Sequence, residues 1–217
     1  ARAPRVFLIP GNDDCRAEEE ALGAAGARGA WEYAHGRRLE FGRFTVLGYA
    51  CVPPTPFRLK DWERYDVSRF VDPGCVSPEE GARTVPVEER EARWSTIAAD
   101  LDELADGVDL ADAICLFHAP PYDTPLDRAA LDGRSVDHAP LDVHVGSIAV
   151  RRFLERRQPL LSLHGHVHES ARLTGEWRTR LGRTHCLSAA HAGPELALVR
   201  VDPARPDGAT RELLATG

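Results

Sequence analysis

Three short apolar runs, each followed at once by polar residues, constrain the fold of this 217-residue chain most strongly. The runs cover residues 6–9, 113–117 and 160–163. Each is short and bounded by turn-forming or polar residues, as a buried strand is. Segments in which apolar residues recur with helical spacing lie between the runs. Strands that alternate with helices predict one α/β domain of layered sheets and helices.

Local signals predict the remaining elements. Three helices are expected, over residues 15–25 capped by Asp13 or Asp14, residues 96–105 capped by Ser95, and residues 148–157 capped by Ser147. Further strands are expected over residues 38–41, 44–49, 180–187 and 196–201. Residues 53–86 are rich in proline and glycine and show no clear period, which predicts a long loop region.

The polar residues that follow the three apolar runs are of the kinds that bind metal ions. They are Gly11-Asn12-Asp13-Asp14, His118, and His164-Gly165-His166-Val167-His168. In layered α/β folds, sites form where loops leave the carboxyl ends of strands. Imidazole with amide or carboxylate oxygen suits Mn, Fe, Zn or Co better than Ca or Mg. Each cluster alone fits an ordinary turn or a structural histidine, but the three together predict a metal site.

Composition excludes several classes of protein. The net charge of −7 argues against non-specific binding to nucleic acid, which needs a basic field. No apolar run approaches the roughly 20 residues that span a bilayer, and the first residues do not resemble a secretion signal. Five cysteines without a C-x-x-C pair argue against a disulfide framework or a zinc ribbon, and we expect a cytoplasmic protein.

In this order, the three clusters resemble motifs III to V of the calcineurin-like metallophosphoesterases. That family has GN(H/D)(D/E), then a lone histidine after a strand, then GHxH. The segments FHAPPYDTPLD, VGSIAVRRFLERRQPLLSLHGHVHES and TRLGRTHCLS also look like one branch of the family. The resemblance implies an αββα four-layer sandwich of mixed β-sheets with two divalent metal ions, chosen from Mn, Fe, Zn and Co with Mn first. It implies that Asn12, His118 and His166 hold one ion and that His168 holds the other.

The resemblance also implies an activity, the hydrolysis of phosphate monoesters or diesters by a hydroxide that bridges the two metal ions. The partner would be a small-molecule phosphate ester, and the loops over residues 53–86 and 120–142 are expected to line its pocket. The alternative is a non-catalytic scaffold, derived from such an enzyme, that binds metal or phosphate. The sequence does not indicate which ester would be the substrate.

The chain departs from the family pattern upstream of Gly11. The family has a D-x-H and a G-D there, which supply three further ligand positions, including an aspartate that bridges both metals. We therefore expect residues 1–217 to be the C-terminal three quarters of the domain, without the first strands of the family fold. Such a chain alone is expected to be inactive and to self-associate as a homo-oligomer through an exposed strand edge. Asp142-Val-His144 is a D-x-H in the wrong order for that motif.

The identity of the proton donor is a second departure. Asp13 stands where many family members have the histidine that protonates the leaving group, and an aspartate is normally ionised at neutral pH. His144 is a candidate donor near Gly146-Ser147, and a surface or capping histidine is the competing interpretation. The candidate catalytic residues are thus Asp13, Asp14 and His144. His164 matches no family ligand, and we expect it to pack in the interior or to support a ligand.

Overall fold

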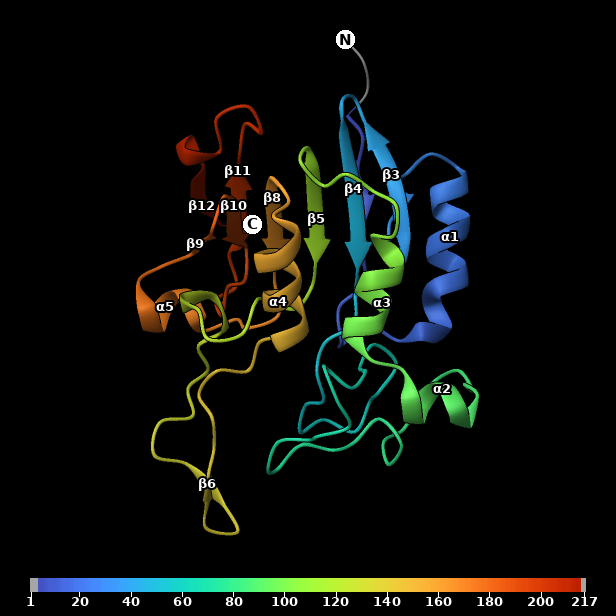
Figure 1. Ribbon diagram of the computed structural model, residues 1–217, viewed down its shortest axis with the longest axis vertical. Coiled ribbons are helices and arrows are strands. Elements are labelled where there is room, and N and C mark those ends of the chain that lie inside the picture. The colour runs from blue at the N-terminus through green and yellow to red at the C-terminus, as the bar shows by residue number, and fades with distance from the viewer. Residues whose placement is uncertain (1–3, 216–217) are drawn as a thin grey trace.

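A six-stranded mixed sheet occupies the centre of the computed structural model, which describes residues 4–215 (Figure 1). In sheet order its strands are β3 (Arg37–Phe41), β4 (Phe44–Tyr49), β5 (Ala113–Phe117), β8 (Leu161–His164), β10 (Thr184–Ser188) and β9 (Arg178–Leu181). The four inner strands run parallel, and the two edge strands are antiparallel to their neighbours. The inner strands are largely buried, as their apolar sequences predict.

Two helices cover one face of this sheet. They are α3 (Ile97–Leu104) and α4 (Ile148–Arg157), which lie side by side in Figure 1. The expected apolar stripe of α3 is confirmed, because Ile97, Leu101 and Leu104 are all buried. Phe153 of α4 packs against Phe117 of β5, with ring centroids 5.7 Å apart. The main hydrophobic core therefore lies between these helices and the sheet.

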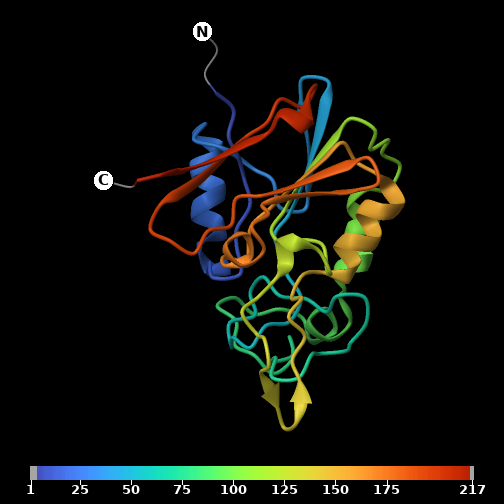
Figure 2. The same cartoon turned by 90° about the vertical axis from the view of Figure 1, so that its left-hand side faces the viewer.

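Two pairs of short strands cover the opposite face. β1 (Phe7–Leu8) runs parallel to β2 (Glu32–Tyr33), and β11 (Leu196–Arg200) runs antiparallel to β12 (Thr210–Leu214). A second core lies between them and the sheet. Helix α1 (Glu19–Ala27) packs beside β2, on the opposite side of the molecule from α3 and α4 (Figure 2). The α/β sandwich predicted from the sequence is confirmed. In residues 4–215, however, its second strand layer consists of two separate pairs and not one continuous sheet.

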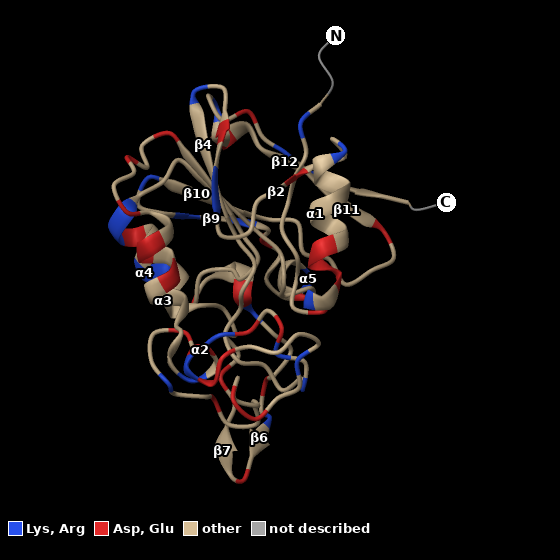
Figure 3. Cartoon of the chain, turned by 90° about the vertical axis from the view of Figure 1, so that its right-hand side faces the viewer, with Lys and Arg blue, Asp and Glu red and all other residues tan. Residues whose placement is uncertain are grey.

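Loops at the carboxyl ends of the inner strands form the lower part of the molecule in Figure 1. They contain α2 (Glu89–Trp94) and the small hairpin of β6 (Ser135–Val136) and β7 (Ala139–Pro140). As predicted, residues 53–86 form neither helices nor extended strands. A fully buried pair organises this segment: Lys60 Nζ donates to Glu63 and also to the Thr55 carbonyl at 2.9 Å. Acidic and basic segments are interspersed over this part in the view of Figure 3.

Several local predictions were wrong. Thr96, not Ser95, caps α3, because its hydroxyl accepts from the Ala99 amide. Neither Asp13 nor Asp14 caps the first helical segment, which begins with a 3-10 turn over Arg16–Glu18. Residues 180–187 are not one strand, because the chain reverses at Gly182, which has φ of +61°, between β9 and β10. Helix α5 (Ser170–Thr174), α2 and β12 were not predicted. Ser147 does cap α4, accepting from the Val150 amide at 3.0 Å.

None of the helices in residues 4–215 combines the length and the apolar character that crossing a membrane requires.

Candidate functional site

Parallel pairing brings the carboxyl ends of β4, β5 and β8 to one edge of the sheet. The His118 amide, just past β5, donates to the Tyr49 carbonyl of β4 at 2.9 Å. The His118 carbonyl in turn accepts from the Gly165 amide, just past β8, at 3.1 Å. Because both neighbours hold its backbone, His118 has a fixed place at the centre of this edge.

The Asn12 side chain joins the first polar cluster to the other two. Its Oδ1 lies 3.0 Å from His118 Nε2 and 2.9 Å from His166 Nδ1. Asn12 is buried, and its Nδ2 donates to Asp13 Oδ1 at 3.2 Å, which turns the amide oxygen toward the two rings. The structure therefore brings Asn12, His118 and His166 together from three segments that are more than 40 residues apart in sequence.

The glycines of the motifs leave room for the His118 ring. A Cβ atom at Gly11 would lie 3.0 Å from His118 Cε1 and 3.1 Å from Nε2. A Cβ atom at Gly165 would lie 3.4 Å from Nδ1 of the same ring. Contacts near 3 Å are too short for a carbon atom, so Gly11 permits the close approach of its backbone to this imidazole.

His166 has a strained backbone. Its φ of +70° is unusual for a residue with a side chain. The Val167 amide donates to the Gly165 carbonyl at 2.9 Å, so His166 is the central residue of a three-residue turn. Such a γ-turn with positive φ is rare and costs about 1–3 kcal/mol. This turn directs Nδ1 of His166 at Asn12.

Burial keeps both imidazoles neutral. It lowers the pKa of His118 to about 4, with a smaller opposing contribution from Asp14. Burial, with smaller contributions from the neighbouring His118 and His168, lowers the pKa of His166 to about 3. Neutral imidazole is the form that binds a metal ion.

The other predicted site residues lie around this cluster. His168 is exposed and is close enough to lower the pKa of both rings, but it forms no hydrogen bond or ion pair with the described residues. Asp13 and Asp14 are exposed, and the Asp14 carboxylate accepts from the Gly11 amide at 2.7 Å, which closes the turn. Their predicted roles in catalysis and in binding a second metal stay predictions.

His144 is held by a buried aspartate that sequence analysis missed. His144 Nδ1 lies 2.8 Å from Asp127 Oδ1, and the Asp127 side chain is fully buried. Three backbone amides also donate to this carboxylate, those of Asp123, Thr124 and Gly146. Ser147, and not His144, caps α4, and the role of His144 as a proton donor stays a prediction. Within residues 4–215 the structure shows no hydrogen bond or ion pair between His144 and the Asn12 cluster.

His164 is packed in the interior, as expected. Its Nδ1 donates to the Ala119 carbonyl at 2.9 Å, and its Nε2 is buried without a hydrogen-bond partner among the described residues. Burial lowers the pKa of His164 to about 4. This histidine therefore anchors the chain just after His118 and does not take part in the Asn12 cluster.

The donor set around Asn12 fits one divalent ion of the first transition series. It offers two neutral imidazole nitrogens and one amide oxygen, a combination that suits such ions. Ligands about 2.1 Å from an ion and at right angles to each other lie about 3 Å apart, close to the two measured separations. Within residues 4–215 no group of three or more His, Cys, Asp or Glu side chains could hold a metal ion. The fit thus rests on the Asn12 oxygen as the third ligand.

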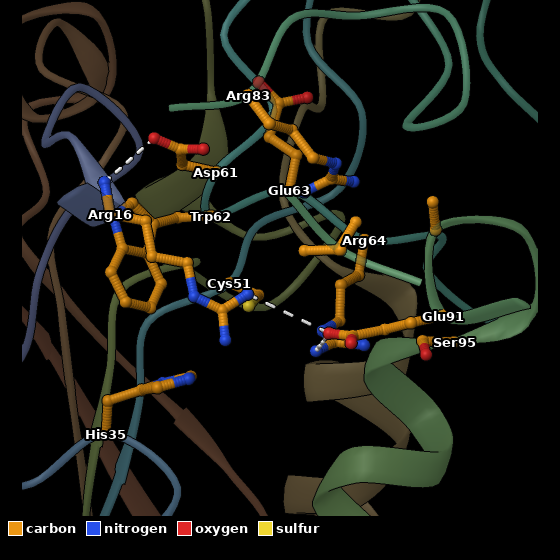
Figure 4. Close-up of a pocket in the computed structure, with 12 residues that line it drawn as sticks. Arg16, His35, Cys51, Asp61, Trp62, Glu63, Arg64, Arg83, Glu91 and Ser95 are labelled. Atoms are coloured by element: carbon orange, nitrogen blue, oxygen red, sulfur yellow. Dashed lines mark hydrogen bonds and ion pairs between the residues drawn. The ribbon is translucent and has the colours of Figure 1, made fainter. Parts of the chain in front are cut away.

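Three arginines line a small hollow with a volume of about 20 Å³, here called the arginine hollow (Figure 4). The arginines are Arg16, Arg64 and Arg83, and His35 and Glu91 also line the hollow. The loop region over residues 53–86 contributes part of this lining. Sequence analysis did not single out the arginines, because they are far apart in the chain and follow no pattern.

Comparisons with known proteins support the fold. No protein-family model matches the sequence, and no curated protein matches it. One solved crystal structure is similar over 96% of this chain, with a TM-score of 0.59 and 16% identity, and the chain spans 65% of that protein's length. TT1561 of Thermus thermophilus is similar over 95% of the chain and 71% of its own, with a TM-score of 0.49 and 18% identity. At such identity the likeness to the first structure shows a shared α/β fold and nothing about activity.

Proposed function

We propose that this chain carries the site of a metal-dependent phosphate-ester hydrolase of the calcineurin-like metallophosphoesterase type. The observation that carries the proposal is the convergence of Asn12 Oδ1, His118 Nε2 and His166 Nδ1 within about 3 Å. These are the three residues that the motif resemblance assigns to one metal ion. A structural role alone would not explain why a strained residue presents its imidazole to a buried amide.

Metal binding requires a change of tautomer at both histidines. Asn12 Oδ1 can only accept hydrogen bonds, so His118 Nε2 and His166 Nδ1 carry the ring protons when they contact it. For these atoms to bind an ion, each proton must move to the other ring nitrogen. Because both rings are neutral, the proton shifts within an uncharged ring and no net charge is added.

When bound, a divalent ion would act as a Lewis acid toward phosphate oxygens and lower the pKa of a water molecule. The residues of this chain would hold the metal ligands in position for that reaction. Asp13 fixes the amide of Asn12 through the contact to Nδ2, and the backbone partners of His118 fix its ring. The net reaction adds water across the ester bond, so that the alcohol leaves with a proton.

His144 is proposed as the source of that proton. Its Nδ1 is engaged by Asp127, which leaves Nε2 as the nitrogen that can donate. The buried carboxylate fixes the orientation of the ring in the same way as the aspartate of a catalytic triad orients its histidine. The exposed Asp13 stays a poor candidate for the acid.

A non-catalytic metal-binding scaffold is the second candidate. It is favoured by the small ligand set, since in residues 4–215 only two histidines and one amide oxygen converge. Both functions predict a bound ion, and only the hydrolase predicts turnover. The second ion at His168 is expected for the hydrolase alone.

Metal loading and an ester screen on the same samples test the proposal. The protein is loaded with Mn, desalted and subjected to elemental analysis, and a panel of phosphate monoesters and diesters is then assayed with added Mn. We expect at least one bound ion, and both this ion and any turnover should be lost in His166→Ala. The matched control for metal loading is His138→Ala, because His138 is exposed and also has a positive φ, +69°. Metal binding that His166→Ala leaves unchanged would refute the site, and a bound ion without turnover on any ester would favour the scaffold.

A further inference from the structure

The backbone turn that carries Asn12 is anchored at its upstream end by the second strand layer. Within the turn, the Asp14 amide donates to the Gly11 carbonyl at 3.1 Å, and the Gly11 amide donates to the Asp14 carboxylate at 2.7 Å. Just upstream, the Leu8 carbonyl of β1 accepts from the Ala34 amide at 2.8 Å. A short turn keeps its place in a fold only if both of its ends are held, so the downstream end needs an anchor as well.

The downstream end lacks a cap from its own neighbours in sequence. The 3-10 turn over Arg16–Glu18 begins two residues after Asp14, and the intervening Cys15 supplies no side-chain cap within the described part of the chain. The first N–H groups of a helical segment have no partner inside it, and a side-chain oxygen normally accepts from them. The amides of Arg16 and Ala17 therefore need acceptors from elsewhere in the chain.

Two side chains of the loop region over residues 53–86 supply these acceptors. Asp61 Oδ2 accepts from the Arg16 amide at 2.8 Å, a contact drawn as a dashed line in Figure 4, and Thr84 Oγ1 accepts from the Ala17 amide at 3.0 Å. The two side chains also hold each other, because the Thr84 hydroxyl donates to Asp61 Oδ2 and the Thr84 amide donates to Asp61 Oδ1 at 2.9 Å. This pair, here called the Asp61–Thr84 clasp, caps the helical segment from more than 40 residues away in sequence.

The interior of the loop region fixes the clasp in turn. Asp61 is buried, so its carboxylate depends on these amide and hydroxyl donors in place of water. The preceding residue, Lys60, is fully buried, pairs with Glu63 and donates its backbone amide to the Ala82 carbonyl at 2.8 Å. The loop region therefore presents its two acceptors at fixed positions.

Resting on the proposed function, we propose that the Asp61–Thr84 clasp is the positioning device of the metal site, because it holds the turn so that Asn12 Oδ1 stays within ligand distance of His118 and His166. Within residues 4–215 neither clasp residue forms a hydrogen bond with the two imidazoles, so both act through the backbone that leads to Asn12. A functional side chain must be held within about 0.5 Å of its productive position by supporting contacts. The clasp thus couples the loop region to the metal site.

The Mn affinity of matched cap variants tests the clasp without any measurement of turnover. Thr84→Ala removes the acceptor of the Ala17 amide, and it opens no buried cavity because Thr84 is exposed. We expect the Mn affinity, measured by EPR titration of free Mn, to fall about tenfold, as is typical when a supporting contact of a metal ligand is lost. Thr84→Ser, which keeps the hydroxyl, should bind Mn as the wild type does.

Thr96→Ala is the matched control, because Thr96 caps α3 through the same kind of contact, 3.2 Å from the Ala99 amide. It should lose as much thermal stability as Thr84→Ala and keep the wild-type Mn affinity. Asp61→Asn is the second clasp variant, in which an NH₂ group replaces one acceptor oxygen, and it decides if Thr84→Ala does not fold. An unchanged Mn affinity in the clasp variant, or an equal loss in Thr96→Ala, would overturn the inference.

The tautomer of His166 gives a measurement that needs no metal. In the metal-free protein His166 Nδ1 carries the proton that it donates to Asn12 Oδ1. Nitrogen NMR of isotope-labelled protein, with a chelator present, shows which ring nitrogen is protonated, and His166→Ala identifies the signals. Thr84→Ala should move part of the proton population to Nε2, and Thr96→Ala should not. If the wild type binds Mn, the affinities decide. If it binds none, the proposed function fails and the tautomer decides: a shift in Thr84→Ala alone supports the clasp as the device that places Asn12, and an unchanged tautomer overturns it.

Discussion

Acid should destabilise the metal-free protein through histidines that are buried in the neutral form, and His35 is the clearest case. Its Nδ1 accepts a hydrogen bond from the Ala50 amide, so protonation would place two donors against each other. Burial lowers the pKa of His35 to about 4, with smaller electrostatic contributions from Glu19, Arg64 and Arg16. The unfolded chain retains a histidine pKa of about 6.5.

The sign and the size of the effect follow from these two values. Between pH 6.5 and pH 4 the unfolded state binds more protons than the folded state, so the free energy of unfolding falls as the pH falls. For a histidine whose pKa is lowered to about 4, the loss between pH 7 and pH 5 is about 2 kcal/mol. His164, whose pKa is also lowered to about 4, should contribute a similar amount. Together they would remove about 4 kcal/mol from a total stability that is typically 5–15 kcal/mol.

Urea unfolding at pH 7 and pH 5, with a chelator present, measures this loss. His35→Asn is the informative variant, because the asparagine oxygen can still accept from the Ala50 amide while the side chain no longer titrates. The variant should lose about 2 kcal/mol less than the wild type between the two pH values, whatever its stability at pH 7. His138→Asn, on an exposed turn, should behave as the wild type does. If His35→Asn loses as much stability as the wild type, His35 does not titrate as argued.

Three further variants have clear expected outcomes. His118→Ala should abolish metal loading and turnover while the circular dichroism spectrum stays unchanged. The reason is that the His118 ring lies at a strand end next to the buried Asn12 amide and not in the hydrophobic core. Metal loading equal to that of the wild type would show that His118 is purely structural. Asp13→Asn should reduce turnover by far less than the 10²–10⁴-fold that is typical of a lost general acid, which a pH–rate profile of both proteins will show. Asp127→Asn should lower the free energy of unfolding by about 2–3 kcal/mol, because its amide NH₂ would face backbone N–H donors. The His144 ring should also lose the carboxylate that fixes its orientation. An unchanged urea midpoint would contradict this prediction.

Sequence analysis predicted the Asn12 cluster because each of its members directly follows a strand that the sequence marks clearly. Once the inner strands are parallel neighbours, their carboxyl ends must lie together, and residues such as His118 and His166 then have little freedom of position. The strands were marked by compact apolar runs, and this is why β5 has the predicted bounds. Local pattern and sheet topology agree here, which makes such a site predictable.

Features that depend on contacts distant in sequence could not be predicted. Asp127 is 17 residues from His144, and although Thr124 and Asp127 form a capping box that the sequence could have indicated, nothing local marks the contact of Asp127 with His144. The arginine hollow combines Arg16, from a 3-10 turn, with Arg64 and Arg83 from irregular loops, and no period relates these residues to one another. The missed reversal between β9 and β10 did have a signal, because Gly182 interrupts an otherwise apolar and polar alternation.

The strain at His166 can be measured, and the measurement decides whether the surrounding fold or the contact to Asn12 imposes this conformation of the GHxH segment. A left-handed φ of +70° penalises every residue with a Cβ atom and does not penalise glycine. If the turn between Gly165 and Val167 is imposed by the surrounding fold, His166→Gly should be more stable than His166→Ala by about 1 kcal/mol, the reverse of the usual order for these residues. Both variants lose the contact to Asn12, so the difference between their urea midpoints isolates the backbone strain. We expect neither to bind metal. A glycine variant less stable than the alanine variant would mean that the turn relaxes once the imidazole is gone, and that the contact to Asn12, not the fold, imposes the strained conformation.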